Sequence, residues 1–189
     1  MRPGGVERRE FEGTRHGTQT LIANFEVATG QIMAPSIGPT GTEADFAAHT
    51  EQTLQTDPQA QWVFIVDQLN THQSESLVRL VNKHCECNLD EAGLGVKSKS
   101  GICILHSIET RKAFLADSSH RIRFVYTPKH ASWLNQVEIW FSVLVRRLLK
   151  RSSFRSTQEL RKRILDFIDY FNATAKPLKW TYAGRPLYR

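Results

Sequence analysis

Hydrophobic and polar residues alternate near the start of the chain, and this pattern predicts a β-hairpin. In Thr18–Val27, apolar residues occupy every second position, which is typical of a strand with one buried face. Thr29-Gly30 supplies a turn, and Gln31–Ile37 returns as the second strand. Pro35 has no N–H to donate, so we expect it to fray this second strand.

Five apolar residues follow one another in Trp62–Val66, which predicts a strand buried on both faces of a mostly parallel sheet. Asp67 comes directly after this strand, at the carboxyl edge where open α/β sheets collect ligands. The carboxylate is therefore a candidate ligand or catalytic group. A turn role leading into Asn70-Thr71 is the alternative that the spacing leaves open.

A later strand and helix carry a second candidate acid. Ile122–Tyr126 predicts a strand that Pro128 ends, and Ser132 offers a hydroxyl N-cap to the next helix. The apolar residues of that helix recur at spacings of three and four: Trp133, Val137, Trp140, Phe141, Leu144, Val145 and Leu148. Glu138 lies on the margin of this stripe, where a partly desolvated carboxylate needs a basic partner or a metal ion.

Capping signals predict further helices. Thr42 and Ser74 can each cap a helix, and Ser156 with Glu159 has the spacing of a capping box. Residues 85–120 have loop composition apart from a short helix at Ile108–Leu115, and we interpret them as an insertion. Its candidate DNA contacts are Lys97, Lys99, Arg111 and Lys112.

The composition is that of a single α/β domain. The chain has 189 residues, 40% of them hydrophobic, which is enough for a substantial core. No run of eighteen apolar residues occurs, and the N-terminus lacks the apolar core of a signal peptide. We therefore expect a soluble, cytoplasmic protein. The three cysteines, an odd number, argue against a disulfide framework.

Positive charge is concentrated in one segment. Residues 146–163 hold eight basic residues against one acid, a local charge of +7, which leaves the rest of the chain at −1 out of a total of +6. Such a cluster is suited to contacts with a phosphate backbone. A solvated helical face that only keeps the protein soluble is an equally good interpretation of composition alone.

Two blocks of sequence resemble a known enzyme family. Thr127–Glu138 closely resembles the block around the last catalytic acid of bacterial insertion-sequence transposases in the mariner-like branch of the DDE superfamily. Val66–His72 resembles the block around that family's second acid. The two acids lie 71 positions apart, at 67 and 138, and in the family's order. Two blocks together are a more specific signal than either one alone.

The resemblance implies an α/β fold of the RNase H-like type, with a mixed sheet flanked by helices. It implies that Asp67 and Glu138 are catalytic ligands of two Mg²⁺ or Mn²⁺ ions, since hard cations prefer carboxylate oxygens. The family's first acid lies on a strand upstream of Thr18, and we expect this opening strand to be missing. We assign residues 18–175 to the partial catalytic domain, 1–17 to a loosely ordered lead-in and 176–189 to an irregular tail.

The same resemblance implies metal-dependent cleavage of transposon-end DNA and strand transfer into target DNA. The candidate supporting residues around the acids are Asn70, His72 and Asn135, and the candidate DNA-binding residues are Lys129, His130, Arg146, Arg147, Lys150 and Arg151. Expected partners are DNA, further copies of the chain or full-length transposase, with nucleoid association. The alternative is a non-catalytic module that binds DNA or assembles with transposase without cutting.

Overall fold

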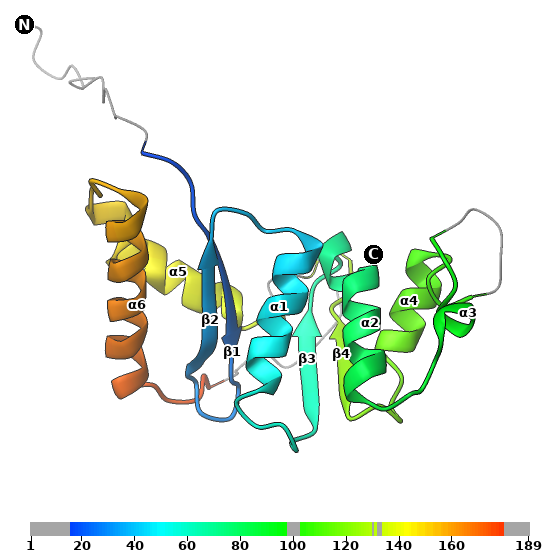
Figure 1. Ribbon diagram of the computed structural model, residues 1–189. Helices are drawn as coiled ribbons and strands as arrows, with labels where there is room; N and C mark the ends of the chain where they lie inside the picture. The colour runs from blue at the N-terminus through cyan, green and yellow to red at the C-terminus, as the bar shows by residue number, and fades with distance from the viewer. Residues whose placement is uncertain (1–15, 98–102, 130, 132–133, 180–189) are drawn as a thin grey trace, which may run out of the picture.

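The computed structural model describes residues 16–97, 103–129, 131 and 134–179, and shows a mixed α/β fold consistent with the predicted RNase H-like class (Figure 1). The elements run in the order β1 (Thr20–Phe25), β2 (Ile32–Gly38), α1 (Glu43–Leu54), β3 (Trp62–Val66), η1 (Asn70–Gln73), α2 (Glu75–His84), α3 (Glu91–Leu94), α4 (Ile108–Leu115), β4 (Ile122–Tyr126), α5 (Val137–Arg147), η3 (Leu149–Arg151) and α6 (Thr157–Ala173). None of the described helices is long and apolar enough to cross a membrane.

The predicted hairpin is confirmed. β1 and β2 pair antiparallel, with a register shift between Ile22 and Asn24. Gly30 closes the turn at a φ of +77°, a conformation that L side chains rarely adopt. A Cβ added there would lie 2.1 Å from the carbonyl oxygen of Lys176, so the chain that follows α6 packs directly on the hairpin turn.

β3 and β4 form a second, parallel sheet, in which Trp62 pairs with Ile122 and Val66 with Tyr126. One face of this sheet packs under α2 and α4 in a core that contains Leu77, Val81, Leu105, Leu115, Ile122 and Phe124. The other face is open. Val63 and Ile65 are 52% and 50% exposed, so the prediction that β3 is buried on both faces was wrong.

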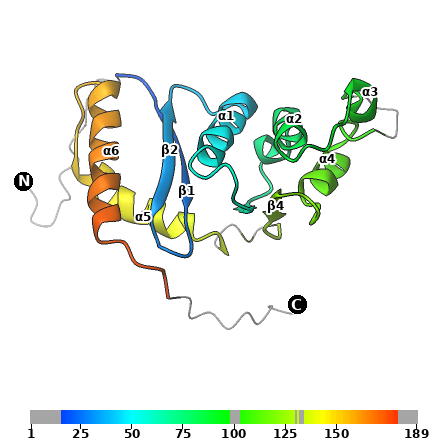
Figure 2. The ribbon, with the colours of Figure 1, turned by 60° about the horizontal axis from the view of Figure 1, so that its bottom comes forward.

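A second core joins the hairpin to α5 and α6, with Trp140, Ile164 and Ile168 at its centre. Both views show α1 lying between the hairpin and the β3–β4 sheet (Figures 1 and 2). Its contacts with the hairpin are polar: Asn24 Nδ2 donates to Thr53 Oγ1 at 2.6 Å, and Ser36 Oγ lies 2.8 Å from His49 Nδ1. Asp45 and Thr42 form a full capping box at the start of α1.

Two predictions about helix starts need correction. The helix expected to begin at Ser132 begins at Val137, because Asn135 Oδ1 accepts the N–H of Val137 and holds the preceding residues in a turn. Ser132 itself lies outside the described residues. At α6, the Ser156 hydroxyl accepts from Glu159 as predicted, but the Glu159 carboxylate accepts from the N–H of Arg155 and not from that of Ser156.

Candidate active site

Asp67 lies at the carboxyl end of β3, in the loop that opens from the β3–β4 sheet. Parallel pairing brings the end of β4 to the same edge, where the N–H of Thr127 donates to the carbonyl of Val66 at 2.9 Å. The Asp67 side chain is 40% exposed, and its Oδ1 accepts the N–H of Leu69 at 3.0 Å. The carboxylate is therefore held in one orientation at an accessible edge.

His72 contacts this carboxylate, with Nδ1 2.8 Å from Asp67 Oδ1. The η1 turn holds the imidazole, which packs on the ring of Phe46 at a centroid distance of 4.3 Å. Burial lowers the pKa of His72 from its usual value, and the neighbouring Asp67 carboxylate partly opposes this shift. The neutral imidazole consequently dominates at neutral pH.

A second polar group joins the two strand ends. Gln68 Nε2 donates to the carbonyl of Thr127 at 2.5 Å, and Gln68 Oε1 accepts from Lys112 Nζ at 2.9 Å. Lys112 also lies over the ring of Tyr126, 4.7 Å from its centroid, while the Tyr126 hydroxyl donates to the His72 carbonyl. These contacts tie α4 to the edge that carries Asp67. The sequence offered no pattern that would pair Gln68 with Thr127 or Lys112 with Tyr126.

Glu138 lies in the first turn of α5, and its residue is exposed, so the expectation that the apolar stripe would partly desolvate its carboxylate was wrong. The N–H of Glu138 donates to the carbonyl of Asn135 at 3.1 Å, and Asn135 Nδ2 donates to the carbonyl of Ile65 at 3.4 Å. Ile65 is two residues before Asp67. The beginning of α5 therefore lies against the carboxyl end of β3, on the side away from β4.

A comparison with protein-family models matches the DDE superfamily endonuclease model over residues 1–161. The chain belongs to the DDE superfamily endonucleases. No curated protein and no solved structure gave a match.

Enzymes of this superfamily use divalent metal ions. In the described part of the chain, no group of three or more His, Cys, Asp or Glu side chains is arranged to hold a metal ion. The carboxylate of Asp67 has oxygen atoms suited to a hard cation. Asp67 and the neighbouring His72 are, however, too few ligands for a complete metal centre. A full metal site in this DDE endonuclease needs at least one further ligand.

The predicted DNA-binding residues fall mainly at the far end of α5. Arg146, Arg147 and Lys150 are all exposed, and Arg146 Nε donates to the carbonyl of Ser142. Lys129 is exposed in the loop between β4 and α5. His130 and the side chain of Arg151 lie outside the described part. Asn70 is exposed at the start of η1.

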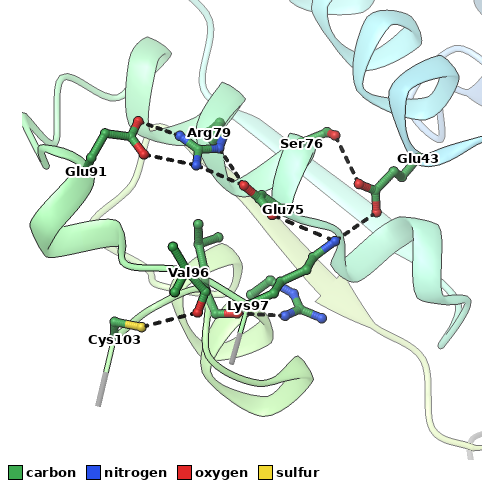
Figure 3. Close-up of polar contacts among 10 residues, drawn as sticks. Glu43, Glu75, Ser76, Arg79, Glu91, Val96, Lys97 and Cys103 are labelled. Carbon is green, nitrogen blue, oxygen red and sulfur yellow. Dashed lines mark hydrogen bonds and ion pairs between the residues drawn. The ribbon is translucent and has the colours of Figure 1, made fainter. Parts of the chain in front are cut away.

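Two of the basic residues proposed as DNA contacts in the insertion have structural roles. Arg111 is only 9% exposed and donates to the carbonyls of Gln73 and Leu105, so its assignment to a DNA contact was wrong. Lys97 pairs with Glu43 and Glu75 in an ion network that also links Arg79 to Glu91 (Figure 3). Lys99 lies outside the described residues. Among the described residues of this group, Lys112 reaches the edge beside Asp67 through Gln68 and Tyr126.

Proposed function

We propose that this DDE endonuclease domain cleaves transposon-end DNA with divalent metal ions and transfers the freed strand to target DNA, as in bacterial insertion-sequence transposases of the mariner-like branch. Asp67 and Glu138 are two of the metal ligands in this proposal. The observation that supports it is the hydrogen bond from Asn135 to the carbonyl of Ile65. It brings the helix that carries Glu138 to the strand that ends in Asp67, although 71 positions separate the two acids.

The surroundings of Asp67 suit a metal ligand. The N–H of Leu69 and the ring of His72 fix one carboxylate oxygen, which limits the orientations of the other. His72 is a positioning residue here, because it acts through Asp67. Carboxylate oxygens prefer Mg²⁺ or Mn²⁺, and these ions supply charge stabilisation for phosphodiester cleavage.

The positive charge on α5 suits DNA that approaches this edge. Glu138 and Arg147 lie nine positions apart, which is about 14 Å along a helix that rises 1.5 Å per residue. That length corresponds to about four base pairs of duplex at 3.4 Å per pair. A duplex that runs along α5 from the arginines at its end would therefore reach the acid at its beginning.

A second candidate function is a DNA-binding or assembly module that does not cut. It is favoured by the finding that the described residues bring together no group of three potential metal ligands. Under this proposal the basic residues of α5 bind DNA, and cleavage requires an acid that the described residues do not supply.

The two functions are separated by a nicking assay on a labelled duplex that carries a transposon end, in Mn²⁺. Autonomous cleavage predicts metal-dependent nicks that Asp67→Asn and Glu138→Gln each reduce by at least about a hundredfold. The control is Asp169→Asn, which removes an exposed acid on α6. Binding without nicks in all four proteins supports the module, and nicks that survive both site variants contradict the assignment of the acids.

A further inference from the structure

Lys112 is a cation that the fold partly buries. Of the lysines in the described part of the chain, it is the one that is not exposed. It lies in the last turn of α4, and both views place this helix beside β4 (Figures 1 and 2). The preceding residue, Arg111, donates to the carbonyls of Gln73 and Leu105, which fixes how α4 is turned. A partly desolvated ammonium group is unfavourable unless a negative charge faces it.

The groups that contact the Lys112 ammonium are neutral. Its Nζ donates to Gln68 Oε1 at 2.9 Å and lies 4.7 Å from the centroid of the Tyr126 ring. Among the described residues no carboxylate forms an ion pair with it, whereas the exposed Lys83 and Lys97 each pair with glutamates. An ammonium has three N–H donors, and the described part of the chain offers an acceptor to one of them. The group therefore has both charge and donors available for a ligand.

These neutral partners belong to the edge of the sheet that carries Asp67. Gln68 follows Asp67 in the chain, and its Nε2 donates to the carbonyl of Thr127 at 2.5 Å. Tyr126 is the last residue of β4, and its hydroxyl donates to the carbonyl of His72 at 2.8 Å. His72 in turn contacts the Asp67 carboxylate. The ammonium group therefore lies at the carboxyl ends of both β3 and β4, close to the candidate catalytic acid.

We propose that Lys112 binds a backbone phosphate of the DNA strand that reaches Asp67, and that Gln68 holds the ammonium group only until the strand arrives. This inference rests on the proposed binding of DNA at this edge. A phosphate oxygen supplies the negative charge that the Gln68 amide lacks, and hydrogen bonds between charged groups are stronger than those to neutral acceptors. Lys129, exposed in the loop after β4, adds positive charge near the same strand end.

The competing explanation is that Lys112 only ties α4 to the sheet. The two roles differ in what they require of Gln68. If the hydrogen bond between Lys112 and Gln68 is purely structural, loss of either side chain breaks the same contact and has the same effect on DNA binding. If Gln68 is a resting partner, its loss frees the ammonium group for phosphate. Binding then stays as tight as before or becomes tighter without Gln68, and it weakens without the charge of Lys112.

The test is the salt dependence of binding to a labelled duplex that carries a transposon end, measured by fluorescence anisotropy without divalent metal. Lys112→Met keeps the apolar stem and removes the charge. It should weaken binding and reduce the slope of log K against log salt by about 0.9, the value for one phosphate. Lys112→Arg keeps a cation and should retain the slope. The matched control is Lys83→Met, which removes a charge already paired with Glu51 and should change the slope much less.

Gln68→Met separates the two roles, because it keeps the length of the side chain and removes its hydrogen bonds. We expect this variant to bind the duplex at least as tightly as the wild type, with the same slope. Weakening equal to that of Lys112→Met overturns the proposal, as does a slope in Lys112→Met that matches the Lys83→Met control.

Two further outcomes are decisive. If circular dichroism shows that Lys112→Met does not fold, Gln68→Glu replaces it. A carboxylate at this position pairs with the ammonium group and should reduce the slope by a similar amount, so an unchanged slope in Gln68→Glu overturns the proposal. A wild-type chain that binds no duplex overturns the proposed function and this inference with it. A wild type that binds, together with variants that fail these expectations, overturns this inference alone.

Discussion

At the scale of single residues, His49 is a buried titratable group that makes stability depend on pH. Burial lowers its pKa from 6.5 to about 4, and its Nδ1 lies 2.8 Å from Ser36 Oγ. The unfolded chain binds a proton below pH 6.5 while the folded chain does so only near pH 4, so stability falls as the pH drops through this window. We expect a loss of about 2 kcal/mol between pH 7.5 and pH 5.0, measured by urea unfolding. His49→Gln should remove most of this change, and an identical pH dependence in the variant would contradict the assignment.

The residues of the candidate site could be predicted from the sequence only in part. Asp67 is a candidate because it directly follows a run of apolar residues, and Glu138 because it lies on the margin of an apolar stripe. The contacts of Gln68 and Lys112 could not be found in this way. They join residues 59 and 44 positions apart, and their partners are a backbone carbonyl and a side-chain amide, which leave no periodic pattern.

At the scale of elements, the turn of the β1–β2 hairpin is fixed by one glycine. Gly30→Ala should destabilise the fold by at least about 2 kcal/mol, because the residue has a φ of +77° and a Cβ would collide with the carbonyl of Lys176. Gly38→Ala is the matched control, since a Cβ there meets nothing within 4 Å. Thermal unfolding of both variants measures the difference. Similar losses in the two proteins would show that the segment after α6 does not pack on the turn as described.

Elements were predicted well where local chemistry decides them. The caps at Thr42 and Ser74 and the hairpin turn at Gly30 each depend on neighbours within a few residues, and all three are confirmed. The start of α5 was wrong because Asn135 takes the N–H of Val137 with its side chain. The sequence does not show whether an Asn within an apolar stripe caps a helix, forms a turn or faces solvent. Its contacts in the folded protein decide which of these roles it takes.

At the scale of the whole molecule, α1 packs into the core of the β3–β4 sheet and contacts the hairpin through polar groups. This arrangement could not be predicted from hydrophobic runs. The five apolar residues of β3 indicate a strand, but they do not specify what covers each face. Trp62 and Phe64 pack on the core under α2 and α4, whereas Val63 and Ile65 remain exposed. The number of strands that meet at β3 is a property of the assembled fold and depends on segments distant in the chain.

The proposed binding of DNA depends on how charge is distributed over the whole surface. Arg146→Ala combined with Arg147→Ala should weaken binding to a duplex and reduce the slope of log K against log salt by up to about 1.8, if each arginine neutralises one phosphate. The control removes the same net charge elsewhere, by Lys83→Ala with Lys97→Ala. These lysines are already paired with Glu51 and with Glu43, respectively, so their loss should change the slope much less. Fluorescence anisotropy from 50 to 200 mM salt measures both slopes. Equal reductions in the two double variants would mean that net charge alone governs binding, and an unchanged slope in the arginine variant would remove the end of α5 from the DNA interface.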